Sequence, residues 1–396
     1  MSIHEPQPAP APVVASPSAR KGRVRAIFQV LAVVAITLVF TLGLLEGALR
    51  LFAPQITQPV TRDMFDIDRG ARFRNKAGAS VVHDSGELHA TYTINSQGVR
   101  GTQVYGPVTP DRTRLLCIGD SFTFGWGVEA DQAFPALLNA DKSAAGQPIE
   151  SINAGVIGYG TSHEVAWMHE YGWALQPKIV VVGFFVGNDV TDVMRDMIYN
   201  KTNTPQQQAV VDMVWRLKGQ GSQQGDVETW LKANSHAYVF LNKIYERLMP
   251  APPKQQPDMT NTAYNYLKQE PPERATGWNT TLSLLDELHW KAEQYGAALV
   301  VVAIPAKEQV DATAWQDMQK SFGLTAADLD RDLPQQRLAA WSAGSGVPVI
   351  DLLPGFRAAG NQQLYFNADP HWTPAGHALA AQLIADGMVK LGLFSR

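Results

Sequence analysis

The longest apolar block of the chain lies near its start. Residues 26–45, AIFQVLAVVAITLVFTLGLL, hold no charged side chain, and a basic cluster at residues 20–25 precedes them. About 20 apolar residues at 1.5 Å per residue cross the roughly 30 Å hydrocarbon core of a bilayer, and a preceding basic cluster favours a cytoplasmic N-terminus. We therefore expect a transmembrane anchor at residues 26–52 after a disordered, Pro- and Ala-rich cytoplasmic tail at residues 1–25.

Two other interpretations of the apolar block compete with an anchor. A buried core helix is one, and a cleaved signal peptide is the other. The signal peptide is disfavoured because the apolar run exceeds the usual length and no small-x-small cleavage site follows in LLEGALRLFAPQ. With an uncleaved anchor, everything after residue 52 lies on the far side of the membrane.

Residues 53–110 are predicted to form a linker and a strand-rich lead-in. Within them, HATYTINSQGVRG at residues 89–101 shows strand-like alternation, and Asn95, Gly98 and Gly101 are typical of tight turns. We expect a strand pair with hairpin-like turns around this stretch.

From residue 111 the pattern changes to short apolar runs separated by amphipathic stretches. Each run is rich in Val, Ile and Leu and is bounded by Gly or Pro, which is typical of strands buried on both faces of a parallel sheet. The runs are RLLCIG, IESINAG, KIVVVGFFVG, AALVVVAIP and VPVIDL. The pattern predicts an α/β domain at residues 111–394 with crossover helices between the strands.

Two of these helices can be placed from their sequences. TTLSLLDELHWKAEQYGA, residues 280–297, has leucines at helical spacing, and in residues 373–392 Thr373 is a predicted N-cap with Pro374 at the first helical position. A stretch at about residues 195–275, rich in Gln, Pro and Lys around two predicted helices, interrupts this rhythm. We interpret it as an insertion or a lid.

Composition excludes several classes of function. The 396 residues carry a formal net charge of -4 and no basic run after residue 25, so nucleic acid is not an expected partner. The single cysteine, Cys117, excludes an intrachain disulfide and a multi-cysteine metal site. His163 and His169 stand six residues apart, which puts them on different helix faces, and we expect them to be surface or packing residues. We therefore predict neither a metal nor a cofactor.

Polar residues with catalytic chemistry follow the predicted strands. Ligands of open α/β sheets lie beyond the carboxyl ends of the strands, and a serine, oxyanion donors and an Asp/His pair are the parts of a serine acyl-transfer site. Each residue alone could be an ordinary turn or helix cap, whereas their joint occurrence after successive strands indicates catalysis. They are Ser121, Gly158, Asn188, Asp189, Asp351, Asp369 and His371.

These residues resemble the SGNH (GDSL-type) hydrolases over residues 111–394. Residues 119–121 (Gly-Asp-Ser) match the first block of that family, residues 153–160 (NAGVIGYG) resemble the second, and residues 187–189 (Gly-Asn-Asp) match the third. The last block departs from the family's common Asp-x-x-His, because Asp369-Pro370-His371 is Asp-x-His. That spacing resembles the variant of SGNH-like proteins of alginate and exopolysaccharide O-acetylation.

A further likeness lies before the first block. Membrane-anchored bacterial SGNH proteins commonly show N-x-x-G-x-R-G, which is resembled here by Asn95, Gly98, Arg100 and Gly101. The resemblance implies a bacterial inner-membrane protein with a single span and a periplasmic catalytic domain.

The resemblance also implies a fold and roles for the site residues. The fold would be a flavodoxin-like three-layer sandwich around a central parallel sheet. Ser121 would be the nucleophile, His371 the base and Asp369 the acid, with Asp351 as the rival acid because it also ends a predicted strand. The oxyanion hole would consist of the Ser121 and Gly158 backbone N–H groups and the Asn188 side-chain amide.

We therefore predict a serine-dependent hydrolase of acyl esters, above all O-acetyl esters, in the cell envelope. The alternatives are an O-acyltransferase that modifies an exported polysaccharide and a catalytically silent carbohydrate-binding module. Expected partners are an acylated carbohydrate or small ester, the membrane through residues 26–52, and the envelope polysaccharide machinery.

Overall fold

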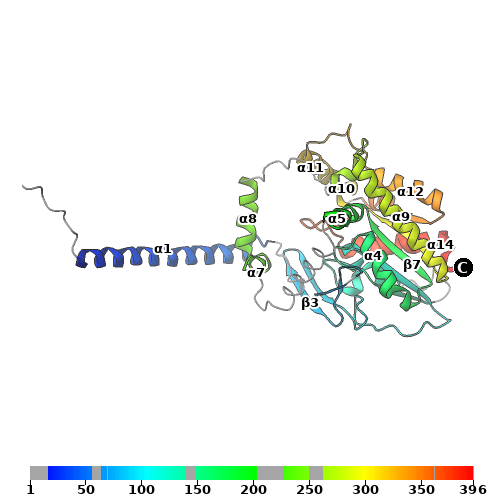
Figure 1. The fold of residues 1–396 in the computed structure, drawn as a ribbon, viewed down its shortest axis with the longest axis horizontal. Helices are drawn as coiled ribbons and strands as arrows, with labels where there is room; N and C mark the ends of the chain where they lie inside the picture. Colours follow the sequence, from blue (N-terminus) through cyan, green and yellow to red (C-terminus); the bar gives the residue numbers. More distant parts are fainter. Residues whose placement is uncertain are drawn as a thin grey trace, which may run out of the picture.

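A long N-terminal helix projects from a layered α/β body (Figure 1). The computed structural model describes residues 17–55, 64–68, 70–139, 148–202, 227–248, 262–360 and 362–395. Helix α1 spans Pro17–Phe52, and its stretch Phe28–Phe52 is long and apolar enough to cross a membrane, with none of its most apolar window buried. The predicted apolar helix is confirmed, whereas its crossing of a membrane stays a prediction. Residues 17–25, predicted to belong to a disordered tail, are part of α1, and residues 1–16 lie outside the described residues.

The body is built on five parallel strands in the order β6-β5-β7-β8-β9. All five correspond to the predicted apolar runs, and the order is that of flavodoxin-like sheets. The predicted α/β fold class is therefore confirmed. The strands are β5 (Thr113–Gly119), β6 (Ile149–Asn153), β7 (Ile179–Phe185), β8 (Ala298–Ile304) and β9 (Val349–Asp351).

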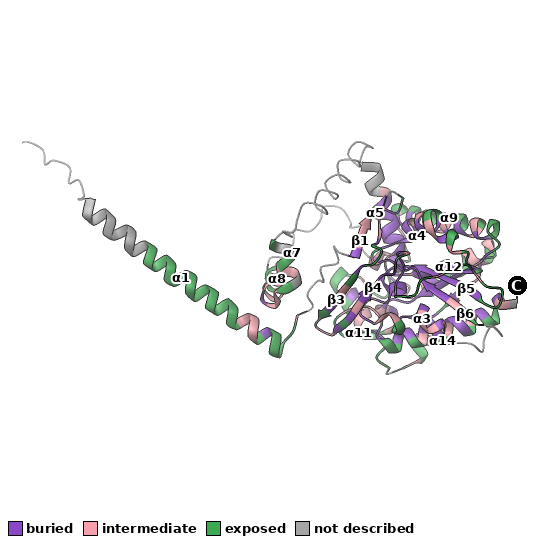
Figure 2. Ribbon diagram, turned by 90° about the horizontal axis from the view of Figure 1, so that it is seen from below, coloured by how far each residue is buried: buried purple, intermediate pink, exposed green. Residues whose placement is uncertain are grey.

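Helices cover both faces of this sheet (Figure 2). Successive side chains of a strand point to opposite faces, so Leu116 and Ile118 pack into one hydrophobic cluster while Leu115 and Cys117 pack into another. The first cluster includes residues of α4 (Thr161–Trp167), α5 (Asp189–Thr202), α9 (Pro272–Gln294) and α12 (Leu333–Ser345). The second includes residues of α3 (Phe134–Leu138), α13 (Leu353–Ala358) and α14 (Pro374–Lys390).

Local sequence signals set the helix ends. Thr373 caps α14 as predicted, since its Oγ1 accepts a hydrogen bond from Gly376 N at 3.3 Å and Pro374 takes the first helical position. Helix α9 begins at Pro272, upstream of the predicted stretch. The remaining short elements are α2 (Ser121–Phe124), η2 (Ala130–Gln132), η3 (Met168–Gly172), η4 (Trp173–Leu175), η5 (Thr262–Tyr266), α10 (Lys307–Val310), α11 (Ala312–Phe322) and η6 (Leu393–Ser395).

The lead-in consists of two antiparallel strand pairs. β1 (Phe65–Ile67) pairs with β2 (Phe73–Asn75), and β3 (Ser80–Ser85) pairs with β4 (Leu88–Thr93). The predicted stretch supplies only β4, because its partner β3 precedes it. Asn95 begins a hairpin-like turn, as predicted, which an isolated antiparallel bridge between Ile94 and Arg100 closes. In this turn Asn95 Oδ1 accepts from Gln97 N and Val99 N, and Gly98 takes the positive φ of 81° that the turn requires.

The predicted insertion contains the end of α5, α7 (Val227–Asn234) and α8 (His236–Leu248). Residues 203–226 and 249–261 of it lie outside the described residues. In Figure 1, α8 stands across the C-terminal end of α1, away from the central sheet. The domain boundaries given above stay predictions.

Candidate active site

Ser121 lies where the chain turns sharply from β5 into α2. Gly119 ends the strand with φ +154°, and a Cβ there would lie 2.1 Å from Thr123 Oγ1 and 2.9 Å from Gly183 O, so only glycine fits. Asp120 then caps α2, since its Oδ1 accepts from Phe122 N at 2.8 Å. The turn places Ser121 at the first position of α2, at the carboxyl end of the sheet.

Ser121, His371 and Asp369 form a continuous hydrogen-bonded line. Ser121 Oγ lies 2.7 Å from His371 Nε2, and His371 Nδ1 lies 2.6 Å from Asp369 Oδ1. An ionised carboxylate can only accept, so Nδ1 carries the ring proton and Nε2 is left to accept from the serine hydroxyl. Asp369 Oδ1 also accepts from the backbone N–H of His371 at 2.9 Å, which fixes the two side chains relative to each other.

The surroundings of Asp369 favour its ionised form. Burial raises the pKa of Asp369, but hydrogen bonds and charge from His371, together with a hydrogen bond from the Trp126 side chain, outweigh burial and hold the pKa below its usual value. The His371 ring packs against Phe122, with ring centroids 4.9 Å apart. Asp369 is thus an acceptor that orients the imidazole.

The rival acid, Asp351, lies in a different arrangement. It ends β9, and its Oδ1 accepts from Leu353 N at 2.9 Å at the start of α13. The structure therefore brings Asp369, and not Asp351, against His371.

The residues predicted for the oxyanion hole follow three adjacent strands. Ser121 follows β5, Gly158 follows β6 on one side, and Asn188 follows β7 on the other. Gly158 is exposed with φ +82°, and a Cβ there would meet only Phe73 Cζ at 3.8 Å. The Asn188 amide lies beside the Asp120 carboxyl and lowers its pKa. Their role as oxyanion donors stays a prediction.

A second glycine of the same loop lies closer to the nucleophile helix. A Cβ at Gly155 would lie 2.3 Å from Phe124 N, so the loop after β6 packs directly on α2. The run NAGVIGYG contains three glycines, and its sequence gives no sign of which one makes this contact.

The lead-in supports the nucleophile turn through Arg100. Its buried guanidinium donates to the carbonyls of Phe124 (3.0 Å), Gly125 (2.9 Å) and Val128 (2.6 Å), which follow Ser121. Burial lowers the pKa of Arg100 to about 10. The arginine of the N-x-x-G-x-R-G stretch is thus a structural clamp on the turn that presents the serine.

The same lead-in also holds the loop that carries Asp369. The Glu87 carboxylate, in the β3–β4 turn, accepts from the backbone N–H groups of Asn367 (2.9 Å), Ala368 (2.6 Å) and Asp369 (2.9 Å). Lys307 Nζ donates to the carbonyls of Phe366 (2.7 Å) and Asn367 (2.8 Å). Sequence reasoning missed Glu87, because no local pattern links it to a loop about 280 residues away.

Three buried carboxyl groups lie close together near the nucleophile. Burial raises the pKa of Asp120 to about 7 and raises those of Glu164 and Asp189 well above their usual values. The charge of Asp120 adds to the rise in pKa at Glu164 and Asp189, and the charge of Asp192 adds to the rise at all three. His163 beside Glu164 is also buried, whereas His169 contacts Glu287 at 2.8 Å. Within the described ranges, no group of three or more His, Cys, Asp or Glu could hold a metal.

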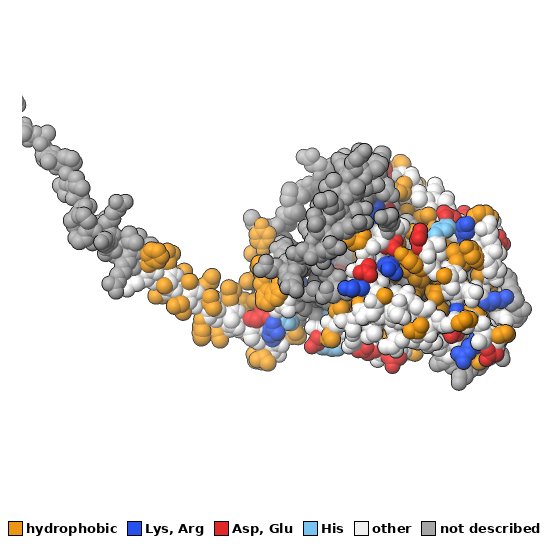
Figure 3. Space-filling view, turned by 60° about the horizontal axis from the view of Figure 1, so that its bottom comes forward, with side chains coloured by type: hydrophobic (Ala, Val, Ile, Leu, Met, Phe, Trp, Pro, Cys, Tyr) orange, Lys and Arg blue, Asp and Glu red, His pale blue; other side chains and the backbone are white. Residues whose placement is uncertain are grey.

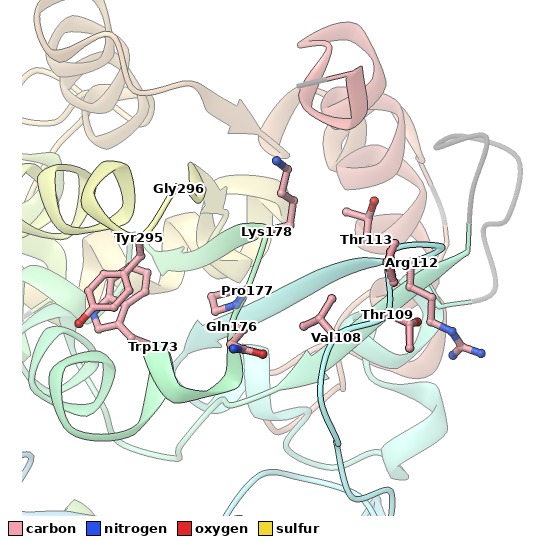
Figure 4. Close-up of a pocket in the computed structure, with 11 residues that line it drawn as sticks. Val108, Thr109, Arg112, Thr113, Trp173, Gln176, Pro177, Lys178, Tyr295 and Gly296 are labelled. Carbon is pink, nitrogen blue, oxygen red and sulfur yellow. The ribbon is translucent and has the colours of Figure 1, made fainter.

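A cavity of about 610 Å³ lies at the opposite end of the sheet (Figure 4). Its lining residues precede β5, β7 and β8, and Trp173 and Tyr295 stack there with centroids 4.7 Å apart. Because ligands of such sheets bind at the carboxyl ends of the strands, this cavity is not the acyl-transfer site. Another hollow, of about 620 Å³, is bordered by Glu87, Phe366 and Asn367 and adjoins the Asp369 loop.

Residues 264–394 match the family model described as "SGNH hydrolase-like domain, acetyltransferase AlgX". The match includes Asp369 and His371, and Ser121 lies before it. A search of the curated proteins found no match to the chain.

Solved structures of esterases are also similar to the chain. A lipase/acylhydrolase from Enterococcus faecalis is 13% identical, with 70% of this chain and 96% of that chain covered and a TM-score of 0.38. An acetylxylan esterase from Geobacillus stearothermophilus, solved as a catalytic mutant, is 12% identical, with 70% and 94% covered and a TM-score of 0.37. With TM-scores this low, these likenesses carry no argument about the function of this chain.

Proposed function

We propose that the chain is a serine-dependent acyl-transfer enzyme of the SGNH hydrolase type, because residues 264–394 match the SGNH hydrolase-like family model. The observation that carries the proposal is the 2.7 Å contact between Ser121 Oγ and His371 Nε2. A serine hydroxyl is a poor nucleophile at neutral pH unless an adjacent base takes its proton, and the neutral Nε2 is such a base.

In the first half-reaction, Ser121 Oγ attacks the acyl carbonyl carbon and its proton passes to His371 Nε2. The imidazolium so formed is stabilised by the Asp369 carboxylate, which keeps the proton of Nδ1 in place. The tetrahedral intermediate then collapses, the bond to the leaving alcohol oxygen breaks, and Nε2 returns its proton to that oxygen. The products are a free alcohol and an acyl-enzyme on Ser121.

In the second half-reaction, a hydroxyl compound attacks the acyl-enzyme. Its proton passes to His371 Nε2, the acyl group leaves with the new oxygen, and Ser121 Oγ recovers its proton from Nε2. The negative oxygen of both tetrahedral intermediates requires donors already in place, for which we propose the Ser121 and Gly158 N–H groups and the Asn188 amide.

We propose O-acetyl esters of a cell-envelope carbohydrate as the substrate class, with hydrolysis by water as the primary reaction. The alternative is acetyl transfer to a hydroxyl of an exported polysaccharide, which the acetyltransferase description of the matched family favours. The same three residues serve both reactions, because they differ only in which hydroxyl reaches the acyl-enzyme.

The first test is hydrolysis of p-nitrophenyl acetate and covalent labelling with a fluorophosphonate by the full chain in detergent. Ser121→Ala and His371→Ala should each lose about 10⁴-fold or more in kcat, because the attack needs both groups. The matched controls are Ser321→Ala, on the surface of α11, and His89→Ala. The His89 ring lies 2.5 Å from the Asp84 carboxylate and has no proposed role in the reaction.

A folded wild-type protein that neither hydrolyses the ester nor takes the label would refute the enzyme proposal in favour of a silent binding module. Addition of a soluble oligosaccharide then separates the two enzymatic reactions. A hydrolase releases acetate and leaves the sugar unmodified, whereas a transferase yields an acetylated sugar detectable by mass spectrometry.

A further inference from the structure

Helix α8 carries a strip of apolar side chains that no described residue covers. Leu241, Ile244, Tyr245 and Leu248 are each between 39% and 72% exposed. They stand at positions i, i+3, i+4 and i+7, so they share one face of the helix. Isolated exposed apolar side chains are common on proteins, whereas four on one helix face indicate a surface that another phase or molecule covers.

The helix before it extends the apolar surface. In α7, Val227 and Trp230 are 71% and 58% exposed and stand one turn apart. Figure 3 shows hydrophobic side chains along α1 and again beside its C-terminal end, where α7 and α8 lie. The exposed apolar surface of α1 thus continues into α7 and α8.

Glu46 of α1 fixes the N-terminus of α8. Its carboxylate accepts from Ser235 Oγ (2.9 Å) and from the N–H groups of His236 (3.0 Å) and Ala237 (2.8 Å). These are donors that the first turn of a helix leaves without an internal partner. A carboxylate at this end also interacts favourably with the helix dipole. Glu46 of α1 thus adds to the local cap of α8, in which Ser235 Oγ accepts from Tyr238 N at 3.1 Å.

More contacts join the two segments on the other side of α8. Gln55 N donates to His236 Nδ1 at 2.7 Å, and Lys243 Nζ donates to Gln55 Oε1 at 3.2 Å. Lys243 therefore marks a face of α8 turned toward the chain that leaves α1, about half a helical turn away from the apolar strip.

Glu46 also determines at which point along α1 the helix α8 is attached. It is the first charged residue after the apolar run 26–45. Since that run alone is as long as the hydrocarbon core is thick, a bilayer centred on it places Glu46 at its boundary, within the last two turns of the apolar stretch Phe28–Phe52. Helix α8, which is bonded to Glu46 and stands across α1 (Figures 1 and 2), then lies parallel to the membrane surface at that boundary.

We propose that α7 and α8 form an interfacial helix pair whose apolar strip lies in the headgroup region of the bilayer that α1 spans. The proposal rests on the membrane crossing of α1, and it does not depend on the chemistry at Ser121. Interfacial helices bury an apolar face about 5–10 Å into this boundary, and Trp and Tyr are enriched there. Trp230 and Tyr245 are the aromatic members of the exposed surface.

The test uses the full chain in lipid nanodiscs with an environment-sensitive fluorophore on single cysteines. Cys117, the only native cysteine, is fully buried and burial raises its thiol pKa to about 12, so it stays unlabelled. The probe positions are Tyr245→Cys and Leu248→Cys. The controls are Lys243→Cys on the opposite face of α8, Phe322→Cys at an exposed apolar site of α11, and Leu38→Cys in the middle of α1.

Lipids brominated near the headgroup end of their chains should quench the label at 245 and 248 and leave it nearly unchanged at 243 and 322. Labels at 245 and 248 that water reaches as freely as position 322 would overturn the proposal. Labels shielded from water but not quenched by brominated lipid would overturn it too, since a protein surface would then cover the strip.

Two further measurements test the membrane crossing of α1 and the proposed enzymatic function separately from the position of α7 and α8. A label at position 38 that lipids brominated at mid-chain do not quench would refute both the membrane crossing of α1 and the interfacial position of α7 and α8. Hydrolysis of p-nitrophenyl acetate by the same labelled samples reports on folding and on the proposed function, so its loss in all samples would refute the enzyme proposal without changing the quenching result.

Discussion

At the scale of single residues, the proposed chemistry depends on how Asp369 holds the His371 ring. The 2.6 Å contact to Nδ1 leaves Nε2 without a proton and aimed at Ser121 Oγ. Asp-x-His is short enough for one carboxylate to accept from both the ring and the backbone N–H of His371. The Asp-x-His spacing thus holds the Asp369 carboxylate and the His371 ring in one fixed arrangement.

We predict that Asp369→Asn lowers kcat for p-nitrophenyl acetate by about 10³–10⁴-fold with little change in KM. An amide can donate to Nδ1 and favour the wrong tautomer, in which Nε2 carries the proton. The matched control is Asp351→Asn, which should retain kcat because Asp351 contacts Leu353 N rather than His371. Equal losses in the two variants would contradict the assignment of the acid.

The buried carboxyl of Asp120 gives a prediction for stability and pH. Because its pKa is raised from 3.8 to about 7, the unfolded chain loses this proton at lower pH than the folded chain. The contribution of Asp120 to stability is therefore fully present below about pH 4 and is lost as the pH rises through about 7.

Asp120→Asn should reduce this fall in the free energy of unfolding between pH 4 and 8. The expected difference from wild type is on the order of a few kcal/mol, since each pKa unit corresponds to about 1.4 kcal/mol. Thermal unfolding of the full chain in detergent at a series of pH values measures it. Asp317→Asn, at an exposed carboxyl of α11, should keep the wild-type pH dependence, and an Asp120→Asn curve parallel to wild type would be evidence against the raised pKa.

At the scale of elements, the β3–β4 hairpin and the turn after it are part of the active-site frame. Arg100 binds the carbonyls that follow Ser121, and Glu87 binds the N–H groups that precede His371. One segment therefore holds both halves of the proposed catalytic line. The halves come from sequence positions 250 residues apart.

We predict that Glu87→Gln lowers kcat by roughly tenfold, equivalent to about 1.4 kcal/mol, and leaves KM nearly unchanged. A single amide oxygen cannot replace the carboxylate that accepts from three N–H groups, so the Asp369 loop should loosen without losing substrate contacts.

The matched control for Glu87 is Asp84→Asn in the same hairpin. Asp84 is exposed and pairs with His89 rather than with the catalytic loop, so its variant should keep kcat. An unchanged kcat in Glu87→Gln would show that Glu87 does not position the site.

At the scale of the whole molecule, α1 and the α/β body have different relations to solvent. The apolar stretch of α1 is exposed along its length, whereas the apolar residues of the sheet are buried between two layers of helices. An exposed apolar helix of this length has no stable place in water, which supports a single span with the body on one side of the membrane.

We predict that the N-terminus is cytoplasmic and the body periplasmic, with α1 uncleaved. In cells carrying single-cysteine variants, a membrane-impermeant maleimide should label Val82→Cys, which is exposed on β3, before lysis, and Ser16→Cys only after lysis. Equal labelling of both without lysis would contradict the orientation. A mature protein that begins after residue 45 would contradict the anchor.

The sequence by itself determined the elements whose signals are local. The five strands are short runs rich in Val and Ile because both of their faces are buried. Thr373 and Pro374 indicate the start of α14 because helix capping depends only on neighbouring residues. It also indicated Ser121, Asp369 and His371, since each follows a strand or precedes a helix. The strand pairing around residues 89–101 was placed only in part, because the partner of β4 lies upstream.

Only the tertiary structure decided what depends on residues far apart in the chain. It placed Asp369 rather than Asp351 against His371, because strand order and loop path determine which carboxyl reaches the ring. It also joined Glu87 to the catalytic loop and Glu46 to the start of α8. Such contacts connect side chains to backbone groups, which every residue has, so no sequence pattern can reveal them.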